Sequence, residues 1–381
     1  MRATPRAEHV GSLLRPASLK AVATAVGAHR PGHSALQQTM SDDQRAELAA
    51  AEDEAIAHAL QRQLACGLDV VTDGEMRRTM FANSFYDAVS GLRPAESRRH
   101  ARSWRNSRGE HIEYPGPPVI QRRLAKVASP GATEVSYLAD LTDAPIKVTF
   151  PAGSWFVGPL ARHDDELADY RNEEEMQMDA LDIERDLIAE SIAAGARYIQ
   201  LDFPSYVLLI DPSSRQSLED GGTDTDAMLE RLLWADRYVV DGSADDVTFG
   251  LHLCRGNNQS SWMFEGALDP IAERFFELPY DTFLVEWDDV ERAGGFSCLR
   301  HLPEGKRAVL GLISTKDAAL EDEDEIVRRV EQAAHYVPLD RLAISPQCGF
   351  ASSYEGNLLS EDDQWRKLEL VGRLADRLWP R

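Results

Sequence analysis

A histidine and a cysteine at the end of one apolar segment are the residues in this sequence best suited to chemistry. The segment Val247–Leu253 predicts a mostly buried strand, and His252 and Cys254 stand two positions apart at its end. Side chains two positions apart on an extended chain point to the same face, so the imidazole and the thiol project together. This pair is half of a zinc site, and a buried structural His–Cys pair is the alternative for this segment taken alone.

Two further candidate ligands, Glu286 and Cys348, stand at the ends of other apolar segments. With His252 and Cys254 they supply one nitrogen, two sulfurs and one oxygen, a tetrahedral set that suits Zn²⁺. Two thiolates and a carboxylate more than neutralise the ion, and the carboxylate is the ligand most easily displaced. An incoming thiol could therefore bind as a thiolate that stays nucleophilic. Cys298 is a competing fourth ligand, but it falls on a predicted short helix.

A fold that gathers strand ends is needed to bring these ligands together. Eight apolar segments predict strands, and most are followed by a segment with helical periodicity: Arg6–Val10, Leu68–Thr72, Ile146–Phe150, Tyr198–Asp202, Val247–Leu253, Thr282–Glu286, Arg307–Leu312 and Leu342–Ser345. Eight such units without a Gly-x-Gly-x-x-Gly loop predict an α/β fold, a (β/α)₈ TIM barrel formed as one domain by residues 1–381. In such barrels the functional residues follow the carboxyl ends of the strands.

Residues from about 79 to 145 break this alternation and predict an insertion after the second strand. The insertion contains an arginine-rich segment, Arg98–Arg108, in an otherwise acidic chain. This segment could be an anion-binding lid, a solvated excursion or a contact in a homo-oligomer, and the sequence leaves these three open.

The composition narrows the class of partner. The 381 residues are 43% hydrophobic and 28% charged, with a formal net charge of −23, which argues against nucleic acid. Neither a membrane-spanning run nor a secretory signal is evident, so a cytoplasmic protein is expected. The four cysteines are too widely spaced for a disulfide scaffold, and Cys66, before Gly67, is interpreted as a packing residue.

The remaining strand ends are also polar. The first delivers Gly11 and Ser12, whose backbone and hydroxyl could hold a small anionic group. The second leads to Glu75, the third to Trp155 and the fourth to Asp202. For these residues the structural alternatives are a strand-to-loop turn at Gly-Ser, a salt bridge from Glu75 to a neighbouring arginine, and a loop cap at Asp202.

With these residues in place, the chain resembles the cobalamin-independent methionine synthase family, specifically its catalytic barrel. The resemblance rests on six ordered matches at strand ends: Val10-Gly11-Ser12, Asp73-Gly74-Glu75, Ile199–Pro204, His252-Leu253-Cys254, Glu286 and Pro346–Gly349. It implies a zinc site of His252, Cys254, Glu286 and Cys348. It also implies an amino-acid thiol pocket, with Ser12 near the carboxylate and Glu75 and Asp202 near the ammonium group.

The chain also departs from the family pattern. Lys316 stands where the family places a histidine that protonates the leaving amine. Because the reference pKa of lysine is about 10.4, an ordinary lysine is a poor proton donor at neutral pH, though a good fixed cation. Trp155 could correspond to the folate-stacking tryptophan of the family, but the local match is loose. The donor of the methyl or alkyl group is therefore left open among a folate, a corrinoid and an epoxide.

These observations predict a zinc-dependent transferase that alkylates a small-molecule thiol. Its simplest form is methyl transfer to homocysteine in methionine biosynthesis, with Lys316 and Asp202 as the catalytic residues. One alternative is an enzyme that resembles epoxyalkane:coenzyme M transferase, for which Lys316 and the arginine-rich segment would suit a sulfonate. A further alternative is a non-catalytic or decarboxylase-like barrel with a structural zinc ion.

Overall fold

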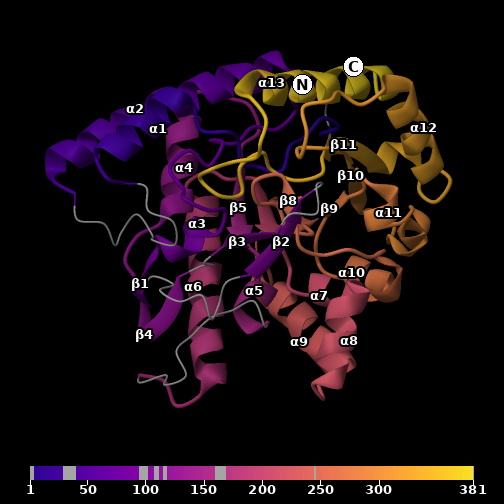
Figure 1. Ribbon diagram of the computed structural model, residues 1–381, viewed down its shortest axis with the longest axis horizontal. Helices are drawn as coiled ribbons and strands as arrows, with labels where there is room; N and C mark the ends of the chain where they lie inside the picture. The colour runs from indigo at the N-terminus through magenta and orange to yellow at the C-terminus, as the bar shows by residue number, and fades with distance from the viewer. Residues whose placement is uncertain are drawn as a thin grey trace.

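The chain folds around a sheet of six parallel strands in the order β11-β10-β9-β7-β6-β5. The computed structural model describes residues 4–28, 40–93, 102–106, 111–114, 118–158, 169–243 and 246–380, with backbone only for 102–106 and 111–114. Figure 1 labels four of these strands, β5, β9, β10 and β11. The bounds of all six match the predictions to within one residue: β5 (Lys147–Pro151), β6 (Tyr198–Asp202), β7 (Thr248–Leu253), β9 (Thr282–Glu286), β10 (Arg307–Ile313) and β11 (Leu342–Pro346).

The first two predicted strands close this sheet into a barrel, although they pair only at isolated bridges. Ala7 bridges Ile344 of β11, and Val71 bridges Ile146 beside β5, both in parallel. Between these two segments the amide of Asp69 donates to the carbonyl of Ala7 at 2.9 Å. The ring of eight extended segments is thus complete, and the predicted α/β barrel is confirmed.

Helices surround the strands in Figure 1. Ser41 caps α2 in a capping box with Gln44, and Asp322 caps α12. None of the helices in the described ranges is long and apolar enough to cross a membrane. The helical bounds are α1 (Ala17–Ala25), α2 (Asp42–Ala65), α5 (Ser154–Val157), α6 (Glu173–Ala193), α7 (Val207–Ile210), α8 (Pro212–Asp220), α9 (Thr225–Tyr238), η3 (Asp269–Ile271), α10 (Ala272–Phe276), α11 (Val290–Ala293), η4 (Ser297–His301), α12 (Glu323–Ala333), η5 (Leu339–Arg341) and α13 (Glu361–Leu378).

The segment between the second and third strands contains structure that periodicity did not predict. After α3 (Asn83–Tyr86), strands β1 (Val89–Arg93) and β4 (Val119–Lys126) form an antiparallel pair. Strand β2 (Arg102–Asn106) pairs with β3 (His111–Tyr114) and with β8 (Ser261–Trp262). Helix α4 (Pro130–Ala139) packs against α6 and β5. It therefore lies beside one of the outer helices, within the predicted insertion of about 79–145.

The barrel interior is polar along one face of β6. Tyr198, Gln200 and Asp202 alternate along the strand and are all buried. The Tyr198 hydroxyl donates to Glu8 Oε2 at 3.0 Å, and Gln200 Nε2 donates to Asp202 Oδ1 at 2.8 Å. Lys147 Nζ lies 3.5 Å from Glu8 Oε2 at the opposite end from Asp202. Gln200 Nε2 also donates to the Val10 carbonyl at 2.6 Å, so Gln200 holds Asp202 at the carboxyl end of the barrel.

Candidate active site

The four predicted metal ligands converge at the carboxyl ends of three strands. His252 and Cys254 lie at the end of β7, Glu286 ends β9, and Cys348 follows β11. One ligand atom of each lies within 4.8 Å of all the others, and all four residues are buried. The Cys254 and Cys348 sulfurs are 3.4 Å apart. Cys298 is buried in η4 and is not part of this group.

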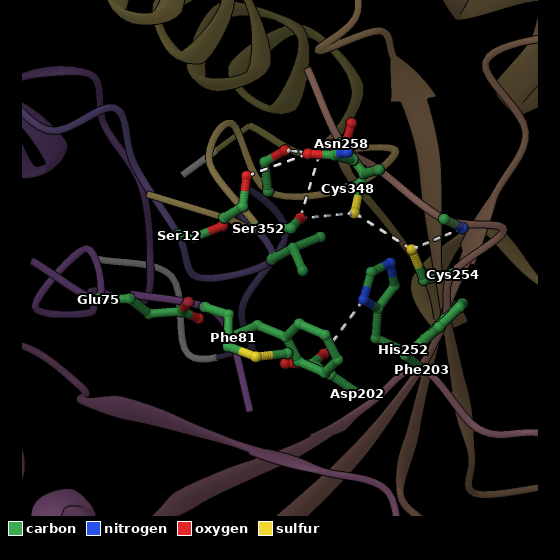
Figure 2. Close-up of a pocket in the computed structure, with 16 residues that line it drawn as sticks. Ser12, Glu75, Phe81, Asp202, Phe203, His252, Cys254, Asn258, Cys348 and Ser352 are labelled. Atoms are coloured by element: carbon green, nitrogen blue, oxygen red, sulfur yellow. Dashed lines mark hydrogen bonds and ion pairs between the residues drawn. The ribbon is translucent and has the colours of Figure 1, made fainter. Parts of the chain in front are cut away.

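Asp202 fixes the orientation of the histidine in this cluster. His252 Nδ1 lies 3.1 Å from Asp202 Oδ1, a contact drawn in Figure 2. Burial disfavours the imidazolium, but the hydrogen bond to Asp202 and the charge of Cys348 outweigh burial and raise the pKa of His252 to about 9. A carboxylate that holds one ring nitrogen is the usual partner of a metal-binding histidine.

The two thiols of the cluster differ in acidity. A hydrogen bond from the Cys254 thiol lowers the pKa of Cys348, and the charges of His252 and Lys316 act in the same direction. Burial and the hydrogen bond to Cys348 raise the pKa of Cys254. Without a metal ion, Cys348 is therefore the more readily deprotonated of the two thiols, and a divalent ion can displace protons from such a pair.

The geometry and chemistry of the donor set fit a zinc ion. Glu286 Oε1 accepts a hydrogen bond from the Arg255 amide at 3.0 Å, which orients the carboxylate. Its second oxygen, Oε2, is buried without a hydrogen-bond partner among the described residues, so it is available to a cation. One nitrogen, two sulfurs and one carboxylate oxygen in a buried cluster match the preferences of Zn²⁺.

Glu75 occupies a strained turn after the second extended segment. Both Gly74 (φ +72°) and Glu75 (φ +57°) are left-handed, and Asp73 Oδ1 accepts from the Glu75 amide at 2.8 Å. A left-handed non-glycine residue is costly and is retained mainly where function or packing requires it. The carboxylate accepts from Thr149 Oγ1 at 2.9 Å and lies 3.8 Å from the Arg78 guanidinium. Burial raises the pKa of Glu75 to about 7 against the opposing charge of Arg78.

Gly11 leaves the space that Glu75 occupies. A Cβ atom at Gly11 would lie 2.8 Å from Glu75 Oε1 and 2.9 Å from Thr149 Cγ2. Ser12, the next residue, is buried. Its hydroxyl lies so close to Gly349 that a Cβ atom added at Gly349 would collide with the Ser12 oxygen. The Gly-Ser turn is thus part of the site through close packing against Glu75 and against the segment that carries Cys348.

Three metal ligands, His252, Cys254 and Cys348, line one pocket with an empty volume of about 590 Å³ (Figure 2). Three predicted substrate-binding residues, Ser12, Glu75 and Asp202, line the same pocket, whereas Gly11 and Glu286 do not. The pocket is lined by Val10, Ser12, Glu75, Met80, Phe81, Asp202, Phe203, His252, Cys254, Gly256, Asn257, Asn258, Cys348, Gly349, Ser352 and Ser353.

Two other predicted site residues, Trp155 and Lys316, do not line this pocket. Trp155 is buried one layer behind the wall, with its ring centroid 5.5 Å from that of Phe81, and its Nε1 donates to Tyr86 at 2.8 Å. Lys316 Nζ is buried without a hydrogen-bond partner in the described part of the chain. Its charge acts on Cys254, which places the ammonium near the metal cluster.

The arginine-rich segment is only partly described. Arg98, Arg99 and Arg108 lie outside the described residues, and for β2, which contains Arg102 and Arg105, only the backbone is described. The pairing of β2 with β8 places the backbone of this segment beside the loop that follows Cys254. The three predicted roles of the segment remain predictions.

Several pocket residues were not predicted from the sequence. Phe81 and Phe203 form an apolar wall, and the loop after Cys254 contributes Asn257 and Asn258. The signal that could have identified the loop is the polar run 255–261 directly after a strand end. Asn257 Nδ2 donates to the Gly349 carbonyl at 2.6 Å, so this loop is tied to the segment around Cys348.

A family model described as "Cobalamin-independent synthase, Catalytic domain" matches residues 23–358. The chain belongs to this family. Two uncharacterized proteins of Bacillus subtilis (strain 168), YxjG and YxjH, are 32% and 33% identical to it, with 98% of this chain and 94% of each relative covered. A 5-methyltetrahydropteroyltriglutamate–homocysteine methyltransferase of Mycobacterium leprae (strain TN) is 24% identical over 86% of this chain, which spans 39% of that relative.

Solved structures of the cobalamin-independent synthase family share the fold. A Listeria monocytogenes protein proposed to be a vitamin-B12-independent methionine synthase superposes with a TM-score of 0.73 at 25% identity, over 100% of both chains. A B12-independent methionine synthase from Shewanella sp. W3-18-1, in complex with selenomethionine, gives a TM-score of 0.68 at 18% identity, with 97% and 96% of the two chains covered. The second likeness supports the fold alone.

Proposed function

We propose that this protein is a zinc-dependent methyltransferase that methylates the thiol of homocysteine to give methionine. One observation carries the proposal: a four-donor cluster suited to Zn²⁺ opens onto the same pocket as two carboxylates and a Gly-Ser turn. This arrangement is consistent with a methyltransferase of the cobalamin-independent synthase family. We further propose that residues 1–381 form one domain.

Seven residues of the site have a role in this proposal. Glu75 and Asp202 pair with the substrate ammonium group, while the Ser12 hydroxyl and backbone hold its carboxylate. His252, Cys254, Glu286 and Cys348 would hold the zinc ion. When bound, this ion would supply a site at which the substrate thiol is deprotonated near neutral pH while its sulfur remains nucleophilic. Asp202 also holds the His252 ring, so one carboxylate couples the amino-acid site to the metal site.

Lys316 is proposed as a fixed positive charge beside the cluster. Its ammonium favours the thiolate form of Cys348 together with the Cys254 hydrogen bond and the charge of His252. Its charge also acts on Asp288, whose pKa is held below the usual range against burial by Arg292 and by Lys316. We propose that Lys316 stabilises negative charge during transfer.

The pocket suits an amino-acid thiol better than a sulfonate thiol such as coenzyme M. Glu75 and Asp202 line it, and no Lys or Arg is present among the described lining residues. Among these lining residues a sulfonate would face two carboxylates and no Lys or Arg, whereas an ammonium group pairs with the carboxylates directly.

A comparison of thiols under identical conditions tests the proposal. Zinc-loaded protein would be given homocysteine, cysteine or coenzyme M with a panel of methyl donors and a small epoxide, and alkylated products would be identified by mass spectrometry. We expect methionine from homocysteine and loss of product after chelation of the metal. Alkylation of coenzyme M by the epoxide in preference to homocysteine would contradict the proposal.

A further inference from the structure

We propose that Glu134, on helix α4 of the insertion, sets the preference of the pocket for a ligand with an ammonium group by keeping Arg78 from pairing with Glu75. Glu134 does not line the pocket, so it is a positioning residue that acts through Arg78. The inference rests on the proposed function, because it explains how the carboxylate assigned to the substrate ammonium group stays free to meet it.

The guanidinium group of Arg78 is committed to Glu134. Its Nε donates to Glu134 Oε1 at 2.8 Å, and its Nη2 donates to Glu134 Oε2 at 2.5 Å. Its third nitrogen, Nη1, donates to Thr149 Oγ1 at 2.8 Å and to the Phe81 carbonyl at 3.1 Å. Both charged side chains are buried. A two-point pair between a guanidinium and a carboxylate is strong and fixed in geometry, so Arg78 turns to another carboxylate only by breaking it.

Glu75 is the carboxylate that Arg78 approaches without a direct hydrogen bond. Arg78 Nη1 lies 3.8 Å from Glu75 Oε1, which is too long for one. The Thr149 hydroxyl, which accepts from Arg78, donates to Glu75 Oε1 at 2.9 Å. Glu75 Oε2 is buried and has no hydrogen-bond partner among the described residues, and Figure 2 shows this side chain pointing into the pocket. Such an oxygen is costly unless a ligand supplies a donor.

Arg15 is a second cation near Glu75, but its donors are used by the backbone. Nη2 donates to the carbonyls of Glu75 and Arg78 at 2.6 and 2.9 Å, and Nη1 donates to the Ala351 carbonyl at 2.8 Å. Burial and the charge of Asp202 raise the pKa of Glu75 to about 7, against the charges of Arg78 and Arg15. The other carboxyl groups that interact with Arg78 are Asp73 and Glu184.

Loss of the charge on Glu134 should send Arg78 to Glu75. A buried guanidinium without a counter-ion is costly, and Glu75 is the one other carboxylate at ion-pair distance from Arg78 in the described part of the chain. Direct pairing would occupy the Glu75 carboxylate. A ligand with an ammonium group would then have to displace Arg78, whereas a ligand without one would bind as before. Glu134 thus controls selectivity without touching the ligand.

The affinities for L-methionine and for its analogue without the amino group test the inference. Calorimetry on zinc-loaded full-length protein would be done at pH 8, because burial also raises the pKa of Glu134 to about 7 and most of both carboxylates is ionised above that value. We expect the wild type to prefer methionine by at least about tenfold, and Glu134→Gln to lower this preference at least about threefold. Glu134→Asp keeps the charge and should retain the preference.

A double variant separates this role from damage to the fold. Arg78→Gln with Glu134→Gln removes the competing cation together with its partner, so the preference should return to the wild-type value. Glu52→Gln removes a partner of the adjacent Arg77 and should leave the preference unchanged. A wild-type preference in Glu134→Gln, or a double variant without that preference, would overturn the inference and leave the proposed function standing. A wild type that does not prefer methionine would overturn both.

Discussion

Cys254 and Cys348 are 94 positions apart in the chain, yet their sulfur atoms lie 3.4 Å from each other in the barrel mouth. The parallel strands bring them together, because the carboxyl ends of β7 and β11 open onto the same end of the barrel. His252 and Glu286 complete the group from the same end. The predictions below concern this group, the carboxylates beside it and the polar interior that positions them.

Removal of one sulfur should abolish tight zinc binding. We expect Cys348→Ser to weaken zinc affinity more than about 100-fold, because loss of a hydrogen-bond partner outside the coordination shell already costs about 10–100-fold. Cys298→Ser is a matched control, since Cys298 is buried but is not part of the cluster. Zinc content after dialysis against a competing chelator is the measurement, and full retention by Cys348→Ser would show that the ligands are assigned wrongly.

Zinc binding should release protons from His252 and from the Cys254–Cys348 pair. The pKa of His252 is raised to about 9, so at pH 7.5 the ring is protonated before the metal binds. Burial and the bond to Cys348 keep the Cys254 thiol protonated as well. Calorimetry in buffers of different ionisation enthalpy should detect at least about two protons released per ion, one from His252 and one from Cys254.

Asp202→Asn should reduce the number of protons released on zinc binding by up to one. Without the carboxylate, burial lowers the pKa of His252, so less of the ring is protonated at pH 7.5.

The same Asp202→Asn variant should alter the pH dependence of stability in the metal-free protein. In the wild type the raised pKa of His252 contributes stability that is fully present below its unfolded value, about 6.5, and is lost as the pH rises through about 9. The fall in Tm over that range should be smaller in Asp202→Asn, and an unchanged slope would contradict the role of Asp202.

The metal ligands could be predicted from the sequence because side chains alternate between the two faces of an extended strand. His252 and Cys254 share a face on any extended strand, and Glu286 and Cys348 follow recognisable apolar segments. Hydrophobic periodicity did not predict the structure where the chain departs from the regular alternation of strand and helix. The first two barrel segments pair through bridges at Ala7 and Val71, and β1 and β4 lie inside the insertion.

The apolar wall of the pocket was unpredictable for a different reason. Phe203 follows Asp202 directly, has a left-handed backbone at φ +58°, and lines the pocket beside it. Sequence patterns give no sign of such a conformation in a non-glycine residue. Trp155, which the sequence suggested for substrate contact, instead supports that wall from behind.

Glu75 should make ligand binding pH-dependent near neutrality. Its pKa is raised to about 7, so the carboxylate that pairs with an ammonium group forms only above that pH. The affinity for L-methionine, which has no thiol proton, should fall toward a tenfold loss per pH unit below pH 7. Glu75→Gln should bind at least about tenfold more weakly and lose this dependence.

Glu52→Gln is the matched control for this measurement. Burial also raises the pKa of Glu52 to about 7, against the opposing charge of Arg77, but Glu52 does not line the pocket. Calorimetric titrations between pH 6 and 8 should therefore show the wild-type dependence in Glu52→Gln. Loss of the dependence in this variant, or its survival in Glu75→Gln, would exclude Glu75 as the titrating group.

The buried pair of Lys147 and Glu8 should be essential for stability. Nζ lies 3.5 Å from Oε2, and both side chains are fully buried in the barrel. Lys147→Met leaves the buried Glu8 carboxylate with Arg307, 3.5 Å from Oε1, as its remaining cationic partner, and should lower the free energy of unfolding by up to about 3–5 kcal/mol. Urea denaturation checks this value. The double variant with Glu8→Gln should recover part of the loss, and a smaller stability in the double variant than in Lys147→Met would contradict the pairing.

X-ray absorption at the zinc edge, with and without homocysteine, tests the central claim most directly. The cluster provides two sulfur ligands, from Cys254 and Cys348. If the metal prepares the substrate thiol for attack, the sulfur count around zinc rises from two to about three when homocysteine is added. A sulfur count that stays at two with saturating homocysteine would contradict the account.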